Sequence, residues 1–345
     1  METHNGDCKM QTWQKLLIVA LLATTIVIAG TFAYLNYFAK RRLIISTTSS
    51  LYDTDLLFAL ETDYEATHSV DIQIISAGTG IAIQHAENGD ADLILVHAPA
   101  QEKIFLEEGW GLNRKIIAYN FFTIVGPSDD PAGIEGKTPT DALKAIAAYG
   151  ESLADQSGAT KTWASRGDNS GTHSKEQTLW KAAGYNYTII PAEPWYASVG
   201  SGMGDTLNVA SQKSAYTLSD IGTFLKFDKD DVISSVALLT EEKSLLNVYS
   251  VMAVNQTVPA NQTLHEQINF ADAMDFIKYM TSVETQQFIE NYGKADYEQS
   301  LFFGAVQPLK SNAPQPLVQW VKDSAFFDGS ECPPQYRNGF PELYS

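Results

Sequence analysis

Residues 43–76 read LIISTTSSLYDTDLLFALETDYEATHSVDIQIIS, and this stretch decides the fold class. Residues 43–47 are mostly apolar and β-branched, which favours a strand, and residues 71–76 repeat that pattern. Between them, residues 55–65 predict a helix. A strand, a helix and a second strand of these lengths are typical of a βαβ unit, so we expect an α/β fold built on a parallel sheet.

The same alternation continues along the chain. We expect helices at 80–87, 141–149, 172–183, 271–281 and 285–292, and strands or extended segments at 93–97, 121–125, 162–164 and 247–254. A polar, Pro- and Gly-rich passage at 127–139 leads into a second lobe. We therefore expect two α/β lobes joined by two crossings, with residues 43–125 plus 247–322 in lobe 1 and 126–246 in lobe 2. Residues 323–345 form a C-terminal extension without a clear period.

The composition is that of a folded, acidic protein. With 345 residues the chain has room for about two domains, and its 44% hydrophobic content is sufficient for ordinary cores. The formal net charge is −18. Because proteins hold nucleic-acid backbones with clustered Lys and Arg, so acidic a chain is a poor nucleic-acid binder, and we exclude that class.

The N-terminal tail, residues 1–42, contains an uncharged and mostly apolar run at 16–39. As a helix this run extends roughly 36 Å, which exceeds the hydrocarbon thickness of a bilayer, about 30 Å. We therefore expect a single transmembrane helix that anchors the protein in the cell membrane. The alternative is a signal peptide cleaved near Ala33, followed by secretion.

The expected orientation of this tail rests on opposing signals. The basic residues at 40–42 favour a cytoplasmic body, whereas three N-x-Thr sequons (Asn186, Asn255 and Asn261) favour an extracytoplasmic one. We expect the body to lie outside the cytoplasm. Cys8 and Cys332 lie on opposite sides of the apolar run, so no disulfide is expected.

Four polar clusters lie where predicted strands lead into helices. The first is STTSS at 46–50, whose hydroxyls and helix N-terminus suit an anion, although an ordinary N-cap needs only one such residue. The second is SAGTG at 76–80, where glycines allow backbone N–H groups to approach an anion, although such turns are common. The fourth, GSGMGDT at 200–206, either closes over a ligand or is a simple turn.

The third cluster, SRGDNSGTH at 165–173, carries the most specific chemistry. Arg166 supplies a planar, permanently charged fork that suits oxyanion oxygens, and Ser170 and Thr172 add hydroxyls ahead of a helix. Asp168 is placed to hold the guanidinium. The alternative is a surface loop with one salt bridge.

Enzyme motifs are absent from the sequence. The G-x-S-x-G spacing of a nucleophilic serine is missing, the phosphate-loop pattern fails at Pro131, and the six histidines form no H-E-x-x-H pattern. We expect no catalytic residues, no cofactor and no bound metal cation. We interpret His97, at the end of a predicted strand, as a hydrogen-bonded structural residue.

From residue 43 to about 307, the chain resembles the tungstate-binding components of ABC importers (TupA-type). The motifs that carry the resemblance are GDAD at 89–92, LVHAP at 95–99, GP at 126–127, DPAGI at 130–134, SRGDNSGT at 165–172, WY at 195–196, GMG at 202–204 and YTLSD at 216–220. The resemblance implies a type II periplasmic-binding fold. In that fold two lobes close around tungstate, which is then delivered to a membrane permease.

The resemblance also implies a ligand-binding set. By position, Thr48, Ser49 and Ser50 fall in the hydroxyl-rich first loop of the family, Arg166 matches its oxyanion-binding arginine, and Thr172, with Thr79 and Ser170, completes the set. The chain departs from the family pattern at Ser46, where a threonine is usual, at Phe121, where an acidic residue is usual, and at Ile221, where an arginine is usual.

Two alternatives stay open at this point. In the first, the ligand is molybdate, phosphate or sulfate rather than tungstate. A protonated phosphate would need an acceptor, which Asp168 provides if its carboxylate faces the ligand. The other alternative is a surface structural protein that has kept the fold. An Arg166 side chain that points into an enclosed cleft would count against that class.

Overall fold

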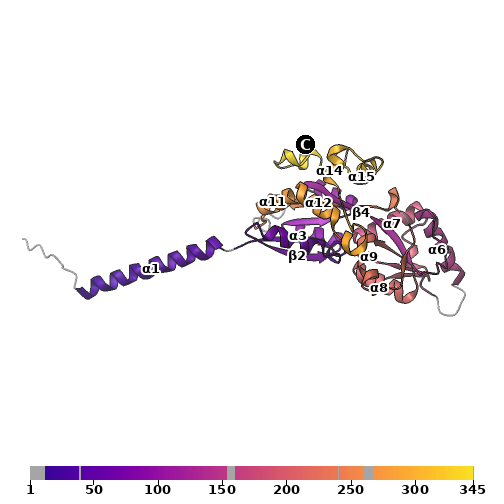
Figure 1. The fold of residues 1–345 in the computed structure, drawn as a ribbon, viewed down its shortest axis with the longest axis horizontal. Helices are drawn as coiled ribbons and strands as arrows, with labels where there is room; N and C mark the ends of the chain where they lie inside the picture. The colour runs from indigo at the N-terminus through magenta and orange to yellow at the C-terminus, as the bar shows by residue number, and fades with distance from the viewer. Residues whose placement is uncertain (1–11, 39, 154–159, 240, 259–266, 345) are drawn as a thin grey trace, which may run out of the picture.

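The computed structural model describes residues 12–38, 40–153, 160–239, 241–258 and 267–344. Cys8 and the sequon at Asn261 therefore lie outside the described residues. The N-terminal helix α1 (Thr12–Phe38) extends away from the compact body (Figure 1), and many of its large apolar side chains are exposed. Within the described residues, no helix combines the length and apolar character needed to cross a membrane, so the transmembrane helix expected at 16–39 is not supported.

The first lobe begins with the βαβ unit that the opening stretch predicts. Strand β1 (Arg41–Thr48) lies between β2 (Val70–Ala77) and β3 (Leu93–Val96), and both neighbours run parallel to it. The connecting helices are α2 (Ser49–Tyr52), α3 (Leu56–Glu65), α4 (Thr79–Glu87) and α5 (Pro99–Glu107). A buried apolar core lies under this sheet and includes Leu43, Ile45 and Leu95.

A long shared strand, β4 (Gly111–Gly126), joins the two halves of the molecule. Its first part pairs with β9 (Leu246–Val254) and β10 (Phe303–Gly304), and its last part pairs with β7 (Thr217–Asp220) and β8 (Val236–Ala237). The predicted parallel sheet is present around β1, but the whole sheet is mixed, because β9 returns antiparallel to both β3 and β4. Only the last residues of β4 were predicted to form a strand.

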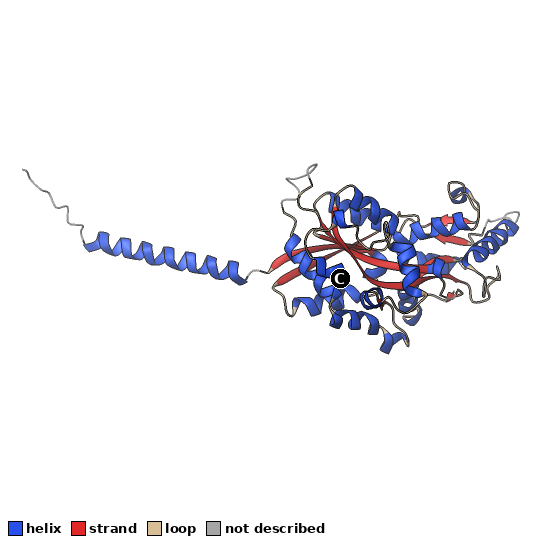
Figure 2. Cartoon of the chain, turned by 90° about the horizontal axis from the view of Figure 1, so that it is seen from above, coloured by secondary structure: helices blue, strands red, loops and turns tan. Residues whose placement is uncertain are grey.

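The second lobe is built around β5 (Trp163–Ser165) and β6 (Tyr196–Ser198), which pair in parallel, together with β7 and β8. Its helices are α6 (Pro139–Leu153), α7 (Gly171–Ala182), η1 (Ile190–Ala192), α8 (Met203–Lys213), α9 (Ile221–Lys229) and η2 (Lys243–Leu245). Its core contains the buried side chains of Trp163, Trp180 and Trp195. Figure 2 shows the helices packed around the strands in both lobes.

The chain then returns to the first lobe through β9. The helices that follow are α11 (Phe270–Thr281), α12 (Val283–Asn291), α13 (Lys294–Tyr297), α14 (Val306–Ser311), α15 (Leu317–Ala325), η4 (Pro334–Tyr336) and η5 (Pro341–Tyr344). The two helices predicted at 271–281 and 285–292 correspond to α11 and α12.

The C-terminal extension is part of the packed body and is held against β4 by a buried ion pair and hydrogen bonds. The carboxylate of Glu331 accepts from the Lys115 ammonium at 2.7 Å and from the backbone N–H of Ile116 at 2.5 Å. The Arg114 guanidinium donates to the backbone oxygens of Ala325 and Glu331 at 2.9 and 2.7 Å. These contacts explain why a segment without a clear period is nevertheless ordered.

Candidate functional site

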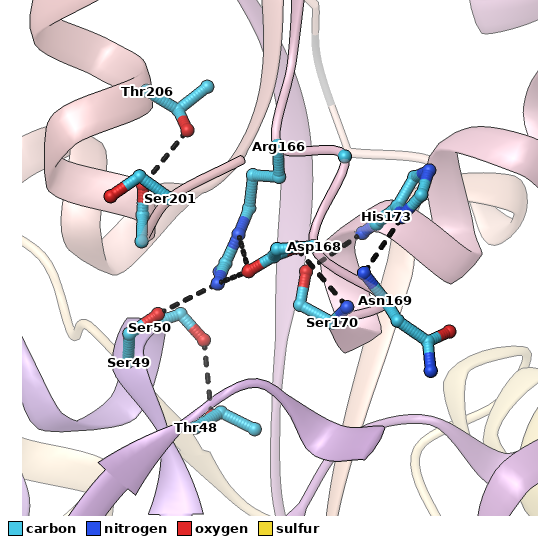
Figure 3. Close-up of polar contacts among 12 residues, drawn as sticks. Thr48, Ser49, Ser50, Arg166, Asp168, Asn169, Ser170, His173, Ser201 and Thr206 are labelled. Atoms are coloured by element: carbon cyan, nitrogen blue, oxygen red, sulfur yellow. Dashed lines mark hydrogen bonds and ion pairs between the residues drawn. The ribbon is translucent and has the colours of Figure 1, made fainter. Parts of the chain in front are cut away.

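Arg166 lies at the interface of the two lobes, directly after β5. Its Nε and Nη2 atoms donate to one oxygen of Asp168 at 3.1 and 2.5 Å, and Nη2 also donates to the hydroxyl of Ser49 at 2.9 Å. Figure 3 shows the guanidinium between these two side chains. The residue is only 2% exposed, and its Nη1 atom is buried without a hydrogen-bond partner. The arginine therefore points inward and has one charged donor free.

Both oxygens of the Asp168 carboxylate accept hydrogen bonds from protein donors. Its Oδ2 atom accepts from Arg166, and its Oδ1 atom accepts from the backbone N–H of Ser170 at 3.2 Å. The sequence analysis placed Asp168 as the partner of Arg166, and the structure has this ion pair. The carboxylate thus orients the guanidinium.

Two further predicted residues carry buried hydroxyls that lack a partner. Thr79 and Thr172 are the first and second residues of α4 and α7, and they are 0% and 1% exposed. Among the described residues, seven buried side-chain polar atoms have no hydrogen-bond partner, and three of them are Thr79 Oγ1, Arg166 Nη1 and Thr172 Oγ1. An unpaired buried donor costs about 1–3 kcal/mol, so these three groups are the candidates to donate to a ligand at the predicted site.

The loops that carry these groups approach one another closely. A Cβ atom added at Gly78, before α4, would lie 3.4 Å from the Cα atom of Ser170, before α7. A Cβ atom added at Gly171 would lie 2.7–2.9 Å from three atoms of the His97 ring, so only glycine fits there. The N-termini of α4 and α7 are therefore brought together with the end of β3.

The first loop places its three hydroxyls differently from one another. Ser49 faces the second lobe through Arg166, whereas the hydroxyl of Ser50 contacts the His97 Nε2 atom at 3.1 Å. Thr48 Oγ1 lies 3.3 Å from the Ser50 hydroxyl. The backbone oxygen of Ser50 accepts from the Thr223 hydroxyl at 3.1 Å, which is a second contact between the lobes.

Other predicted residues have local roles. The Ser170 hydroxyl caps α7 by accepting from the backbone N–H of His173 at 3.2 Å, and the Ser46 hydroxyl contacts the His85 ring at 3.0 Å. In the fourth cluster, the Thr206 hydroxyl donates to the Gly202 oxygen at 2.9 Å. A Cβ atom added at Gly202 would lie 3.6 Å from Ser49, so this turn borders the site.

A buried carboxylate fixes the strand and the helix that carry the second-lobe donors. Glu176 on α7 accepts from the Trp163 ring nitrogen at 3.0 Å and from the Ser165 hydroxyl at 2.7 Å, and both donors lie on β5. Burial raises the pKa of Glu176 to about 7, although these hydrogen bonds oppose the shift. Glu176 could not be predicted from the sequence, because a single Glu on a helix carries no signal of its partners.

The electrostatics of the site favour an anion. The guanidinium of Arg166 is joined by the N-termini of α4 and α7, whose unpaired N–H groups carry partial positive charge. Burial raises the pKa of the nearby Asp53 carboxyl to about 6, and the charge of Asp220 adds to that shift. Asp53 therefore loses much of its negative charge just below neutral pH.

His97 is buried between the loops and is electrically neutral. Burial, together with the charge of Arg166, lowers its pKa to about 3. Its Nδ1 atom contacts the Asn247 side-chain oxygen at 2.8 Å. The expectation that His97 is hydrogen-bonded agrees with these contacts, but the sequence analysis did not connect it to the first loop.

Residues 29–284 match the profile of the PBP superfamily domain. The chain belongs to the PBP superfamily. Within that superfamily, it is 42% identical over 74% of its length to a putative ABC transporter anion-binding protein of Haloferax volcanii, which it covers to 70%. It is 35% identical over 76% of its length to the tungstate-binding protein TupA of Peptoclostridium acidaminophilum, which it covers to 86%. It therefore belongs to the same family as these proteins.

A solved PBP-type structure agrees with this assignment. The chain is 40% identical to the tungstate ABC transporter structure from Geobacter sulfurreducens, with a TM-score of 0.63. The match covers 74% of this chain and 100% of the other. The chain therefore has the α/β periplasmic-binding fold. Its membership in the family of ABC-transporter binding proteins also supports a substrate-binding role.

Two of the departures from the family pattern, at Phe121 and Ile221, have structural explanations. Phe121 is 5% exposed and belongs to the second core, so an acidic side chain in that position would be buried among apolar groups. Ile221 begins α9 and packs against the small apolar cluster around Met203 and Phe224. Both residues contribute apolar packing.

Proposed function

We propose that this protein captures a fully deprotonated tetrahedral oxyanion, tungstate, and delivers it to an ABC permease. The observation that carries the proposal is the set of three unpaired buried donors, Arg166 Nη1, Thr79 Oγ1 and Thr172 Oγ1, at one interface of two lobes. The names of the TupA relatives support tungstate as the ligand. Ser49 adds a hydroxyl from the first lobe, because it accepts from Arg166 and keeps its own hydrogen.

Protonation distinguishes the candidate ligands. A hydrogen phosphate ion would need a protein acceptor for its proton, and Asp168 was the candidate for that role. Arg166 and the backbone N–H of Ser170 already donate to the two Asp168 oxygens, which weakens Asp168 as an acceptor for a ligand proton and supports an oxyanion that carries no proton. This supports tungstate, molybdate or sulfate over phosphate, and cavity size then separates the larger metal oxyanions from sulfate.

The remaining elements of the proposal follow from the clamp geometry. The lobes, 43–125 plus 247–322 and 126–246, close by hinge motion about β4 and β9 when the oxyanion bridges them. The protein is not an enzyme and uses no cofactor. We place the body outside the cytoplasm and propose that the N-terminal tail directs its export. The mass of the mature protein and its cell fraction test that location.

The test of binding is calorimetric titration of the full chain, purified without added oxyanion, with tungstate, molybdate, sulfate and phosphate. Tungstate and molybdate should bind tightly, sulfate more weakly, and phosphate least. Arg166→Ala should abolish binding, whereas the control Arg41→Ala should not, because Arg41 pairs with Asp272 on the outside of the first lobe with a side chain that is 61% exposed. Absence of heat with every oxyanion from a folded protein would contradict the proposal and favour a structural role.

A further inference from the structure

A buried chain of hydrogen bonds runs from the first loop of the site to the far side of the first lobe. Its members in order are Thr48, Ser50, His97, Asn247, Asn120 and the backbone oxygen of Leu301. All six residues are at most 3% exposed. Asn247 lies on β9 and Asn120 on β4, so the chain ties the loop to both strands that connect the lobes.

The direction of the bonds made by the two asparagines is fixed by the end of the chain. The Leu301 oxygen is a carbonyl and only accepts, so the Asn120 amide nitrogen faces it, at 3.2 Å. The Asn120 oxygen then accepts from the Asn247 nitrogen at 2.9 Å. Reversal of either amide would place two acceptors against each other in a buried site. The Asn247 oxygen is therefore the atom that faces His97.

The same reasoning fixes the tautomer of His97. Its Nδ1 atom lies 2.8 Å from the Asn247 oxygen and must carry the hydrogen, so in the neutral ring Nε2 is an acceptor. Ser50 lies 3.1 Å from Nε2 and is its donor. The single hydroxyl hydrogen of Ser50 is then committed to His97. The Ser50 oxygen accepts in turn from a neighbouring hydroxyl, and its two neighbours are Thr48, at 3.3 Å, and Tyr249, which itself accepts from the Asn247 nitrogen at 2.9 Å.

The hydroxyls of the first loop therefore have different roles at the site. Ser50 turns its hydrogen away from an oxyanion, because that hydrogen is used within the chain. Ser49 accepts from Arg166 Nη2 and keeps its own hydrogen. Ser49 is therefore free to donate to a bound oxyanion, whereas Ser50 is not.

We propose that His97 is a positioning residue of the oxyanion site. As the Nδ1–H tautomer it takes the hydrogen of Ser50, anchors the first loop to β9 and β4, and leaves Ser49 rather than Ser50 as a side-chain donor of that loop. This inference rests on the proposed oxyanion binding for its effect on affinity, but the tautomer and the direction of the chain do not depend on any ligand.

The groups that face His97 keep it neutral. The cationic side chains are Arg166 and Lys175 from the second lobe, and Asp168 is the opposing negative charge. The Tyr249 and Phe122 rings lie 4.8 and 6.0 Å from the imidazole, and Gly171 packs against it. Burial beside two cations disfavours the imidazolium form, so the tautomer should persist through the physiological pH range.

The direct test is ¹⁵N NMR of the histidine rings in the full, ligand-free chain. His97 should show a protonated Nδ1 and an unprotonated Nε2, unchanged between about pH 5.5 and 9 because its pKa lies near 3. Ser50→Ala should shift the Nε2 resonance, and the conservative Ser50→Thr should leave it nearly unchanged. A ring with Nε2–H, or one that titrates in this range, would overturn the inference whether or not the protein binds oxyanion.

Tungstate titrations then test the effect on the site. Ser49→Ala should weaken binding about 10- to 100-fold, as expected for loss of a hydrogen bond to a charged group. Ser50→Ala and His97→Leu should each weaken it less, and the double variant should be no worse than either. His97→Gln should retain most of the affinity, because an amide oxygen can accept from Ser50 while its nitrogen donates to Asn247.

The outcomes separate the two proposals. If Ser50→Ala is as costly as Ser49→Ala and its effect adds fully to that of His97→Leu, Ser50 is itself a ligand donor and the positioning role is wrong. If no variant and no wild-type sample binds any oxyanion, the proposed function fails, and the NMR result still decides the direction of the chain.

Discussion

Replacement of Arg166 by Lys separates the geometry of the site from its charge. The guanidinium holds Asp168 through Nε and Nη2, reaches Ser49 through Nη2, and has Nη1 free for a ligand. A lysine keeps the positive charge, but its three hydrogens leave one nitrogen atom and cannot reach all three positions. We therefore expect Arg166→Lys to keep the carboxylate contact and lose the bond to the oxyanion.

The size of the effect follows from that single lost bond. A hydrogen bond to a charged group contributes about 1.5–3 kcal/mol, which corresponds to roughly 10- to 150-fold weaker tungstate binding. The unfolding free energy should change by less, because the backbone N–H of Ser170 still holds Asp168.

The assay pairs calorimetric titration with urea unfolding, and Arg41→Lys is the matched control because Arg41 has the same type of carboxylate partner, Asp272, far from the site. The control should bind as the wild type does. Less than threefold weakening in a folded Arg166→Lys variant would refute the role of Nη1 as a ligand donor.

Three further predictions concern the hydroxyls, the pH dependence and the C-terminal extension. Thr172→Val should weaken tungstate binding by about 1.5–3 kcal/mol without loss of stability, since its hydroxyl has no protein partner and its bond is to a charged ligand. The exposed Thr62→Val should leave affinity unchanged, and titration with urea unfolding measures both effects. The affinity for tungstate should fall as the pH rises through about 6, because the Asp53 carboxyl then becomes charged near a bound dianion. Asp53→Asn should remove this pH dependence in titrations from pH 5.5 to 8. A pH dependence that persists in Asp53→Asn would contradict the role of Asp53. Glu331→Gln should lower the unfolding free energy by about 3 kcal/mol, because it leaves the buried Lys115 ammonium without its carboxylate. Thermal or urea unfolding measures this loss. A loss below about 1 kcal/mol would be inconsistent with the buried pair.

The sequence predicts the parts of this fold that repeat a local pattern. The β-branched run at 43–47 and the hydroxyls after it mark β1 and the first loop, because a strand followed by a capped helix has a local signal. The antiparallel return of β9 and the length of β4 have no such signal. Strand direction depends on tertiary pairing, and β4 continues through polar residues such as Asn113 and Arg114.

The candidate site likewise contains contacts that the sequence predicts and contacts that it does not. Arg166 and Asp168 are two residues apart, so their ion pair follows from the sequence. His97 contacts Ser50 and Asn247, which are 47 and 150 residues away, and no local pattern connects them. Glu331 is similarly remote from Lys115, 216 residues away, which is why the extension had no predicted role.

The most direct test of the central claim is the position of tungsten in crystals grown with tungstate, read from its anomalous scattering. We predict one strong peak between the lobes, with oxyanion oxygens within hydrogen-bond distance of Arg166 Nη1, Thr79 Oγ1 and Thr172 Oγ1. A peak elsewhere on the protein, or protein donors at this interface that pair with each other while tungstate binds in solution, would contradict the claim that these three groups form the ligand site.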